Sequence, residues 1–280
     1  MRIIDCAGRP LKLGRIAVMG ILNVTPDSFS DGGEFQNPRR AVARGVQMVE
    51  EGADLLDVGG ESTRPGATPV SAAEEMGRIL PVIEGLRNAV SVPISVDTSK
   101  PEVMRAAVRT GAGMINDVLA LRMPESIETV AGLGVPVCLM HMQGEPRTMQ
   151  QNPVYSNVAE DVCRFLDERV AACEKGGIPR NRLLVDPGFG FGKTLSHNLD
   201  LLRNLRTVAG LGLPVVAGLS RKSLIGMATG LPTERRLHAS VALALLAARN
   251  GASIVRVHDV GPTVEALRML EAVQPELLET

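Results

Sequence analysis

The sequence predicts one α/β domain over residues 1–280, a (β/α)8 or TIM barrel preceded by a small N-terminal β-hairpin. Short apolar runs rich in β-branched residues alternate with amphipathic segments, and eight such units fit into the 280 residues. Strands that alternate with helices and are apolar on both faces form a parallel sheet. No linker or low-complexity tract marks a second domain. Barrels routinely reach this length, although the pattern leaves an open doubly wound sheet as the alternative.

The first expected element is the hairpin, residues 1–14, with the sequence "MRIIDCAGRPLKLG". The eight barrel strands are expected at residues 16–24, 54–59, 92–96, 114–118, 135–141, 183–186, 213–219 and 253–258. Each run is too short for a helix and is rich in the residues that favour strands. Pro93, Pro136 and Pro214 each sit at the start of one of these strands, where a missing N–H is tolerated.

Helices are expected between these strands. Val42, Val46 and Val49 share one face of the first helical segment, as an amphipathic helix requires. A glycine stands just before several of the next strands, which is typical of a left-handed helix C-cap. The glycines in these positions are Gly52, Gly111, Gly134, Gly176, Gly212 and Gly251.

Composition excludes several classes of function. The net charge is −1 and aromatic residues make up 2%, so neither a nucleic-acid surface nor a base-stacking platform is expected. The four cysteines have no CxxC spacing and predict neither a disulfide framework nor a zinc site. The N-terminus lacks the apolar region of a signal peptide, and no stretch approaches the roughly 18 apolar residues of a membrane span. We therefore expect a cytoplasmic protein with no membrane partner.

Polar residues stand at the carboxyl ends of all eight predicted strands. In TIM barrels the active site is built at these ends. Some of the residues could instead be helix N-caps, but eight convergent ends favour a site. The residues are Asn23, Asp57 with Glu61, Asp97, Asn116 with Asp117, His141, Asp186, Ser220 with Lys222, and Arg256 with His258.

The residue types at these ends predict a ligand with two different sides. Asp97, Asn116 and Asp186 would place acceptors inside an apolar barrel, and buried carboxylates need donors. A flat heterocycle with two adjacent N–H donors would satisfy such a carboxylate, as arginine does. Lys222, Arg256 and His258 form a cationic group suited to a phosphate or carboxylate. The site is therefore expected to bind a donor-rich ring at one end and an anion at the other.

Two further motifs have simpler interpretations than they first suggest. "DPGFGFGKT" resembles a nucleotide-binding loop, but Pro187 occupies the position of the first P-loop glycine. Lys193 stands where the dinucleotide-binding pattern requires its last glycine. His141, in "MHMQG", has no spaced partner for a metal, so we expect a structural histidine hydrogen-bonded beneath the site.

The motifs taken together resemble one enzyme family. "GILNVTPDSFSDGG", "DVGGESTRPG", "SVDTSKPEV", "IND", "CLMHMQG", "DPGFGFGK", "SRKS" and "RVHDV" occur in order across nearly the whole chain. This ordered set resembles bacterial dihydropteroate synthase, the folate-pathway enzyme targeted by sulfonamides. The resemblance implies an alkyl-group transferase that joins 6-hydroxymethyl-7,8-dihydropterin diphosphate to 4-aminobenzoate. Diphosphate would leave first, and the amine would capture a pterin-methyl cation to form 7,8-dihydropteroate.

The resemblance also implies a role for individual residues. The pterin would be bound by Asp97, Asn116, Val118, Met140, Asp186, Phe191 and Lys222. Asn23, Thr63, Arg256 and His258 would bind the diphosphate, and Asn23 would also hold Mg²⁺, the implied cofactor. Phe29, Pro65, Lys222 and Ser223 would frame the aminobenzoate. The catalytic set would comprise Asp97, Lys222, Arg256 and His258, together with Asp31 and Arg64 from two loops expected to order over the diphosphate.

Two related functions remain as alternatives. A methyltetrahydrofolate-binding methyltransferase domain would share the barrel and the pterin-holding residues, but it would need no diphosphate clamp, so "TRPG", "SRK" and "RVHD" argue against it. A non-catalytic pterin-binding paralogue should show damage in the two loops, and none is visible. The family is commonly a homodimer, and the apolar segment 239–248 could form the interface or simply pack in the core.

Overall fold

A computed structural model of the chain describes residues 2–24, 37–62, 68–144 and 148–274. Eight parallel strands form its central sheet: β3 (Ala17–Asn23), β4 (Leu55–Gly59), β5 (Ile94–Asp97), β6 (Met114–Asp117), β7 (Val137–Met140), β8 (Leu183–Asp186), β9 (Val216–Ala217) and β10 (Ile254–Val257). Their order is β8-β7-β6-β5-β4-β3-β10-β9. The strands thus follow one another around the sheet without the reversal of an open doubly wound fold. The predicted TIM barrel is confirmed.

The barrel closes between β8 and β9 through little backbone pairing. One isolated parallel bridge joins Val185 to Val215, and the Val185 N–H donates to the Pro214 carbonyl at 3.0 Å. Strand β9 spans two residues, although the apolar run predicted a strand over 213–219. The neighbouring pairs β7–β8 and β10–β9 have regular parallel register. The seam between β8 and β9 is therefore the weakest part of the ladder in the described barrel.

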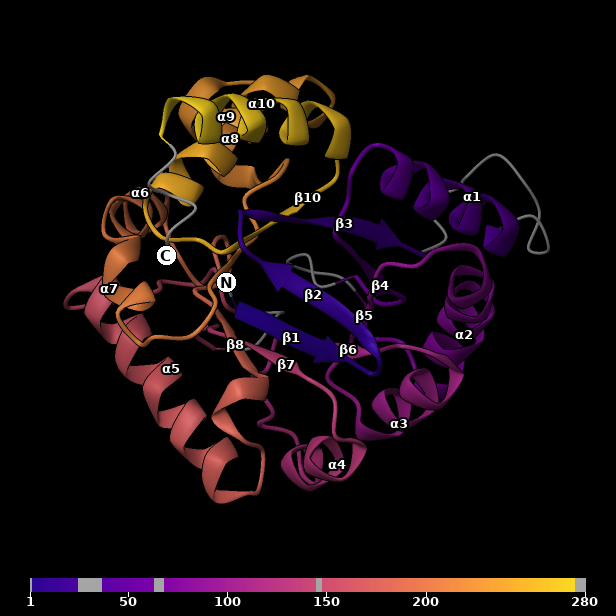
Figure 1. Cartoon of the computed structure of the whole chain (residues 1–280). Coiled ribbons are helices and arrows are strands. Elements are labelled where there is room, and N and C mark those ends of the chain that lie inside the picture. The colour runs from indigo at the N-terminus through magenta and orange to yellow at the C-terminus, as the bar shows by residue number, and fades with distance from the viewer. Residues whose placement is uncertain (1, 25–36, 63–67, 145–147, 275–280) are drawn as a thin grey trace.

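Helices surround the barrel, as Figure 1 shows. They are α1 (Asn37–Glu50), α2 (Ala72–Ala89), α3 (Pro101–Thr110), α4 (Ser126–Leu133), α5 (Val158–Lys175), α6 (Leu195–Arg203), α7 (Leu205–Ala209), α8 (Ser223–Thr229), α9 (Leu237–Arg249) and α10 (Val260–Val273). Short 3-10 helices occupy Arg180–Arg182 and Thr233–Arg235. Within the described residues no helix has the length and apolar character needed to cross a membrane.

Local signals explain most helix and strand boundaries. Five of the six glycines predicted as caps have positive φ, but Gly176 is at −81° and its neighbour Gly177 at +91°, so the prediction was one residue off there. The carbonyls of Pro93 and Pro136 accept ladder hydrogen bonds at 3.1 and 3.0 Å from the strand before. A proline can thus precede these strands because its carbonyl pairs while its nitrogen needs no partner.

The N-terminal hairpin closes one end of the barrel. Strands β1 (Arg2–Cys6) and β2 (Arg9–Leu13) pair antiparallel, as expected for residues 1–14. In Figure 1 the hairpin lies across the front of the barrel. A Cβ on Gly113 would lie 2.3 Å from the Cys6 carbonyl oxygen, so the hairpin packs directly on the chain leading into β6.

An apolar plug fills the barrel interior behind this hairpin. Hairpin side chains pack with one inward-facing apolar residue or more from most of the strands. The buried members of the plug are Ile4, Cys6, Leu11, Ala17, Met19, Leu55, Met114, Cys138, Leu184, Val216 and Ile254. A second, larger apolar core lies between the barrel and its helices. Because the plug occupies the amino ends of the strands, the polar residues are left to the carboxyl ends.

Truncation of the plug should destabilise the whole fold. Leu11 is 1% exposed, and Leu11→Ala should lower the free energy of unfolding by about 2–5 kcal/mol, the usual cost of removing a buried leucine side chain. Ile3, in the same hairpin, is 54% exposed, so Ile3→Ala should change stability by less than about 0.5 kcal/mol. Urea unfolding of both variants measures the difference, and equal losses would show that the hairpin does not seal the barrel.

Candidate active site

A polar layer lies inside the barrel directly above the apolar plug. Side chains on a strand alternate between faces, so the residue two positions after an inward-facing one also points inward. Asp57, Asn116, Asp186 and Arg256 each follow a plug residue by two positions, after Leu55, Met114, Leu184 and Ile254 respectively. The first three are between 0% and 5% exposed. The predicted polar strand ends therefore converge inside one barrel.

Arg256 is the centre of this layer. Its Nε donates to Asp57 Oδ2 at 2.6 Å, and its Nη2 donates to Asp97 Oδ2 at 2.7 Å. Asn116 Nδ2 donates to the same Asp57 oxygen at 3.0 Å. Asp97 and Arg256, expected from the sequence to serve different parts of the ligand, are thus in direct contact. A guanidinium held by two carboxylates is among the strongest side-chain pairings.

Asp57 was noted at a strand end but was not among the predicted site residues. It is fully buried, and its Oδ1 has no hydrogen-bond partner within the described parts of the chain. Its position two residues after Leu55 was the signal that could have placed it in the site. Asp57 fixes the Arg256 side chain from inside the barrel, because it accepts from Nε while Nη2 reaches Asp97.

The two pterin-assigned carboxyl groups have altered acidities. Burial raises the pKa of Asp97 to about 7, while Arg256 opposes the rise and the charge of Asp57 adds to it. Burial also raises the pKa of Asp186, against the charge of Lys222 and a 2.7 Å hydrogen bond from the Gly188 N–H. Both shifts reflect the cost of placing a carboxylate inside the barrel. A donor-rich ligand would lower that cost.

Lys222 follows β9, the strand that lies next to β8 and its terminal Asp186 where the barrel closes. Burial lowers the pKa of Lys222 to about 8, and the charge of Asp186 opposes this shift. The Lys222 ammonium donates to the Phe189 carbonyl and lies 4.7 Å from the centroid of the Phe191 ring. Ser223 is the first residue of α8, directly after Lys222. The structure thus brings Lys222, Asp186 and Phe191 together, three of the residues expected around one ring.

His258 follows β10 and is tied to the turn after β9. Its backbone N–H donates to Ser220 Oγ at 3.2 Å, and its ring Nδ1 lies 3.0 Å from the same oxygen. In the same turn, Arg221 forms an ion pair with Asp259 at 2.5 Å. These contacts hold the turn after β9, which leads to Lys222, against the end of β10, which carries His258.

A separate apolar cluster covers the ends of β6 and β7. Val118, Met140, Met142 and Met149 are buried in it, and Phe191 packs against it. Three of these residues, Val118, Met140 and Phe191, were expected to contact the ring of the ligand. Because Val118 and Met140 follow Asn116 and Cys138 by two positions, the cluster lies on the outer side of the polar layer.

Asn23 ends β3 close to Asp97. A Cβ placed on Gly59 would lie 3.8 Å from both Asn23 Oδ1 and Asp97 Oδ2, so the two oxygens face the same space. No group of three His, Cys, Asp or Glu residues among the described ones could hold a metal alone. The other loop residues expected in the site lie outside the described residues; they are Phe29, Asp31, Thr63, Arg64 and Pro65.

Glu61, at the end of β4, has a structural partner. Lys100 Nζ lies 2.6 Å from carboxylate oxygens of Glu61 and of the fully buried Glu75. The Val70 N–H donates to the other Glu61 oxygen at 3.2 Å. Of the strand-end acids, Glu61 therefore fastens the connection that follows β4 and does not point into the polar layer.

The loop Asp186 to Lys193 is unlike a nucleotide-binding loop. In such a loop the backbone N–H groups face the phosphates. Here the Gly188 N–H donates to Asp186, and the Gly190 N–H donates to Asn198 at 2.7 Å. The carbonyls point to side-chain donors instead. The P-loop and dinucleotide-loop readings are therefore rejected on geometry as well as on sequence.

His141 is the structural histidine that the sequence predicted. It is 5% exposed, its Nδ1 lies 2.9 Å from Lys193 Nζ, and its ring packs edge-on against Phe165 at 4.9 Å. Burial, together with the nearby Lys193, lowers the pKa of His141 to about 2. A neutral imidazole beneath the site follows from these surroundings.

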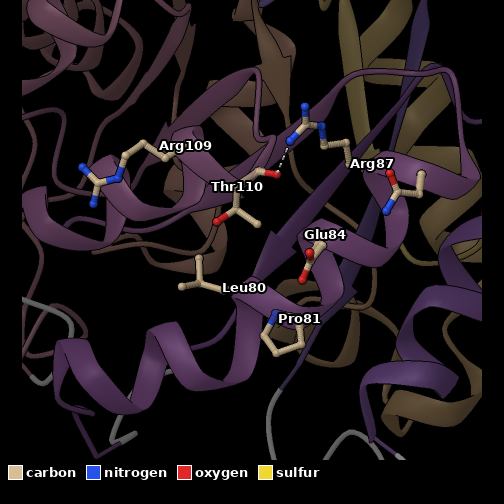
Figure 2. A pocket seen from close by; sticks show the side chains of 7 residues that line it. Leu80, Pro81, Glu84, Arg87, Arg109 and Thr110 are labelled. Carbon is tan, nitrogen blue, oxygen red and sulfur yellow. Dashed lines mark hydrogen bonds between the residues drawn. The ribbon is translucent and has the colours of Figure 1, made fainter.

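A groove on the outside of the molecule is separate from this site. It has a volume of about 580 Å³ and is lined by Leu80, Pro81, Glu84, Arg87, Asn88, Arg109 and Thr110. Figure 2 shows that these residues come from α2 and α3, with Arg87 reaching the Thr110 carbonyl at 3.4 Å. None of the residues predicted for the site lines it.

Known proteins with similar sequence and structure were found over almost the whole chain. The family model "Pterin binding enzyme" matches residues 19–258. Dihydropteroate synthase of Escherichia coli (strain K12) is 52% identical over 265 residues, which cover 95% of this chain and 94% of that protein. A structure of Xanthomonas albilineans dihydropteroate synthase with 4-aminobenzoic acid is 57% identical, with a TM-score of 0.93 and coverage of 97% and 98%. Another, in complex with 7,8-dihydropteroate, is 54% identical with a TM-score of 0.90 over the same shares.

The neutral His141 should make the fold sensitive to acid. Its pKa is about 2 in the folded chain and 6.5 in the unfolded chain, so between these values only the unfolded chain binds the proton. Stability should therefore fall as the pH drops below 6.5, by up to about 1.4 kcal/mol per pH unit from this group. Urea unfolding of His141→Asn should show a shallower loss between pH 7 and 4.5 than the wild type. His238→Asn, at an exposed position, is the control; parallel curves for all three proteins would contradict the assignment.

Proposed function

Because the chain belongs to the pterin binding enzymes, and among them to the dihydropteroate synthases, we propose that it joins 6-hydroxymethyl-7,8-dihydropterin diphosphate to 4-aminobenzoate and releases diphosphate. The observation that carries the proposal is the polar layer. Acceptors and half-buried cations meet at one end of the barrel, with Arg256 bonded to Asp97 where the two groups join. The similar Xanthomonas albilineans structures with 4-aminobenzoic acid and with 7,8-dihydropteroate support these substrates.

The acceptor side of the layer suits the pterin. Arg256 occupies Asp97 Oδ2, so Oδ1 is the oxygen from which a ring N–H pair would gain most. Asp186 and Asn116 present further polar atoms from β8 and β6, while Val118, Met140 and Phe191 supply an apolar surface for the ring. A flat, donor-rich heterocycle would thereby relieve the desolvation that raises the pKa of both carboxyl groups.

The cationic side suits the diphosphate. Arg256 and His258 come from the end of β10, and Asn23 comes from the end of the neighbouring strand β3. Thr63, Arg64 and Asp31, outside the described residues, are proposed to complete this side from the loops after β3 and β4. Positive charge held in place before the reaction stabilises the charge that develops on the leaving diphosphate.

Asn23 is proposed to bind Mg²⁺. The ion prefers oxygen ligands and commonly takes one or two from the protein, with waters and substrate phosphates for the rest. The half-buried Asn23 amide oxygen beside Asp97 fits this role, and the described residues offer no cluster of acidic ligands that would form a full protein cage. When bound, Mg²⁺ would neutralise part of the charge on the diphosphate.

The remaining residues would protect and direct the cation left on the pterin methyl carbon. Asp97 and Asp186 would offset its positive charge while the arylamine approaches. Lys222, which directly precedes α8 and feels the charge of Asp186, would contact both substrates, and Ser223 would bind the benzoate carboxylate. Phe29 and Pro65, outside the described residues, are proposed as apolar walls that exclude water from the cation.

We also propose that the protein is a cytoplasmic homodimer. The cysteines within the described residues form no disulfide, which suits a reducing compartment. Exposed apolar side chains lie on three helices near the C-terminus, of which α9 and α10 pack together: Met227 on α8, Leu246 on α9, and Met269 and Val273 on α10. Such side chains commonly mark an interface. Sedimentation at micromolar concentration tests the dimer, and a monomer alone would refute it.

Formation of dihydropteroate tests the function directly. Purified protein with Mg²⁺ and the pterin diphosphate should form 7,8-dihydropteroate only when 4-aminobenzoate is added, and EDTA should reduce the rate at least about tenfold because the diphosphate would leave without a divalent cation. Liquid chromatography follows the product. Substrate binding without product would instead favour a non-catalytic pterin-binding protein. Undiminished turnover in EDTA would remove the magnesium proposal.

Ionised Asp97 should be required for use of the pterin. Since the pKa of Asp97 is raised to about 7, kcat/KM for the pterin diphosphate should rise with pH through about 7 as the carboxylate forms. Asp97→Asn should lower kcat/KM by about 100-fold or more and remove this rise. Steady-state rates from pH 5.5 to 8.5 measure both effects. A variant with the same pH profile as the wild type would place the titration on another group.

A further inference from the structure

Lys193 is a buried lysine for which the proposed reaction has no use. It is 1% exposed, and its Nζ lies 2.9 Å from His141 Nδ1, 2.9 Å from the Gly188 carbonyl and 3.1 Å from the Phe191 carbonyl. Burial lowers the pKa of Lys193 well below its usual value. Apart from its bond to carbon, the Nζ atom can make three hydrogen bonds, and it has three partners here, so the group is fully hydrogen-bonded. A buried lysine is costly enough that such a complete match calls for an explanation.

The two carbonyls that Lys193 binds stand on either side of the loop segment that contacts Lys222. The Phe189 carbonyl, between them, accepts a hydrogen bond from the Lys222 ammonium. The Phe191 ring lies 4.7 Å from the same ammonium. Lys193 therefore fixes the two parts of the loop that touch Lys222, the Phe189 carbonyl and the Phe191 ring. Its own nitrogen is anchored to His141.

The loop needs this support because its backbone alone does not define its shape. Gly188, Gly190 and Gly192 have φ values of 68°, 81° and 61°, a conformation that gives the chain few internal hydrogen bonds. Most of its carbonyls are instead held by side chains from elsewhere. Gln150 Nε2 donates to the Gly190 carbonyl at 2.6 Å, and the Tyr155 hydroxyl donates to the Gly192 carbonyl at 2.7 Å.

We propose that Lys193 and His141 form a buried clamp that positions Lys222 for the reaction by holding the Phe189 carbonyl and the Phe191 ring. Both members of the clamp are buried, at 1% and 5% exposed, and act through the loop, so both are positioning residues. Their role for Lys222 rests on the proposed function, whereas the geometric part, that the clamp sets the surroundings of Lys222, does not. The two parts can be tested separately.

Kinetics test the catalytic part. Lys193→Met keeps the length of the side chain and removes the hydrogen bonds, so kcat per folded molecule should fall about tenfold or more while unfolding stays cooperative. Gln150→Ala removes an exposed donor to the same loop, and kcat should change less than about twofold. A purely structural role would lower the folded fraction or the melting temperature but leave kcat per folded molecule unchanged, which would overturn the proposal.

The clamp partner supplies a second pair of variants. In His141→Asn the side-chain amide can place a polar atom near the position of Nδ1, whereas His141→Phe keeps the ring contact with Phe165 and removes the nitrogen. His141→Asn should retain more of the wild-type kcat than His141→Phe. If Lys193→Met does not fold, this comparison decides the matter. Wild-type kcat in His141→Phe would show that the clamp is not needed.

Nuclear magnetic resonance tests the geometry without any turnover. The chain has five lysines, so protein labelled with ¹⁵N-lysine has five side-chain nitrogens to distinguish. The Lys222 Nζ signal, assigned with Lys222→Met, should shift in the clamp variants Lys193→Met and His141→Phe and remain in place in Gln150→Ala. An unmoved Lys222 signal in both clamp variants would refute the clamp even if the enzyme is active. If the wild-type protein proves inactive, a Lys222 signal that shifts in both clamp variants would still support the geometric part while the proposed function failed.

Discussion

The pairing of Arg256 with Asp57 and Asp97 is the constraint on which the site depends. Three charged groups inside a barrel would each be costly alone, and they are tolerated because the guanidinium bonds both carboxylates at 2.6 and 2.7 Å. The pairing fixes the cationic end of the layer against the acceptor end. Burial raises the pKa of Asp97 and the charge of the neighbouring acid Asp57 adds to the rise, while the attraction of the Arg256 guanidinium only partly offsets it. The contact that positions Asp97 therefore also limits the rise of its pKa.

The division of the barrel into an apolar plug and a polar layer explains how such a cluster can exist in a stable fold. The hairpin and the first inward-facing residue of most strands close one end without polar atoms. Two residues further along the same strands, the side chains can be charged because the packing beneath them is complete. The alternation of side chains along a strand is enough to produce both layers from one sequence pattern.

The sequence predicted the barrel, all eight strands and the hairpin because periodicity and glycine caps are local signals. The residues at the strand ends could be identified for the same reason. Contacts across the barrel could not, since the bond from Arg256 to Asp57 joins residues distant in sequence whose strands are brought together by β3. Lys193 shows the same limit. The motif around it showed that the loop is not a nucleotide-binding loop, but the burial of Lys193 against His141 depends on how the segment after β7 packs, which no local signal gives.

The thin seam between β8 and β9 gives Lys222 a second importance. Lys222 follows β9, and its ammonium donates to the Phe189 carbonyl after β8. This side-chain contact therefore crosses the same seam as the single backbone bridge. Local opening of a protein begins where few hydrogen bonds resist it. A ligand held by Lys222 and Asp186 would touch both edges of that opening and close it. Occupancy of the site and cohesion of the barrel would then rise together, so slowed amide exchange along β8 and β9 would report binding as directly as an assay does.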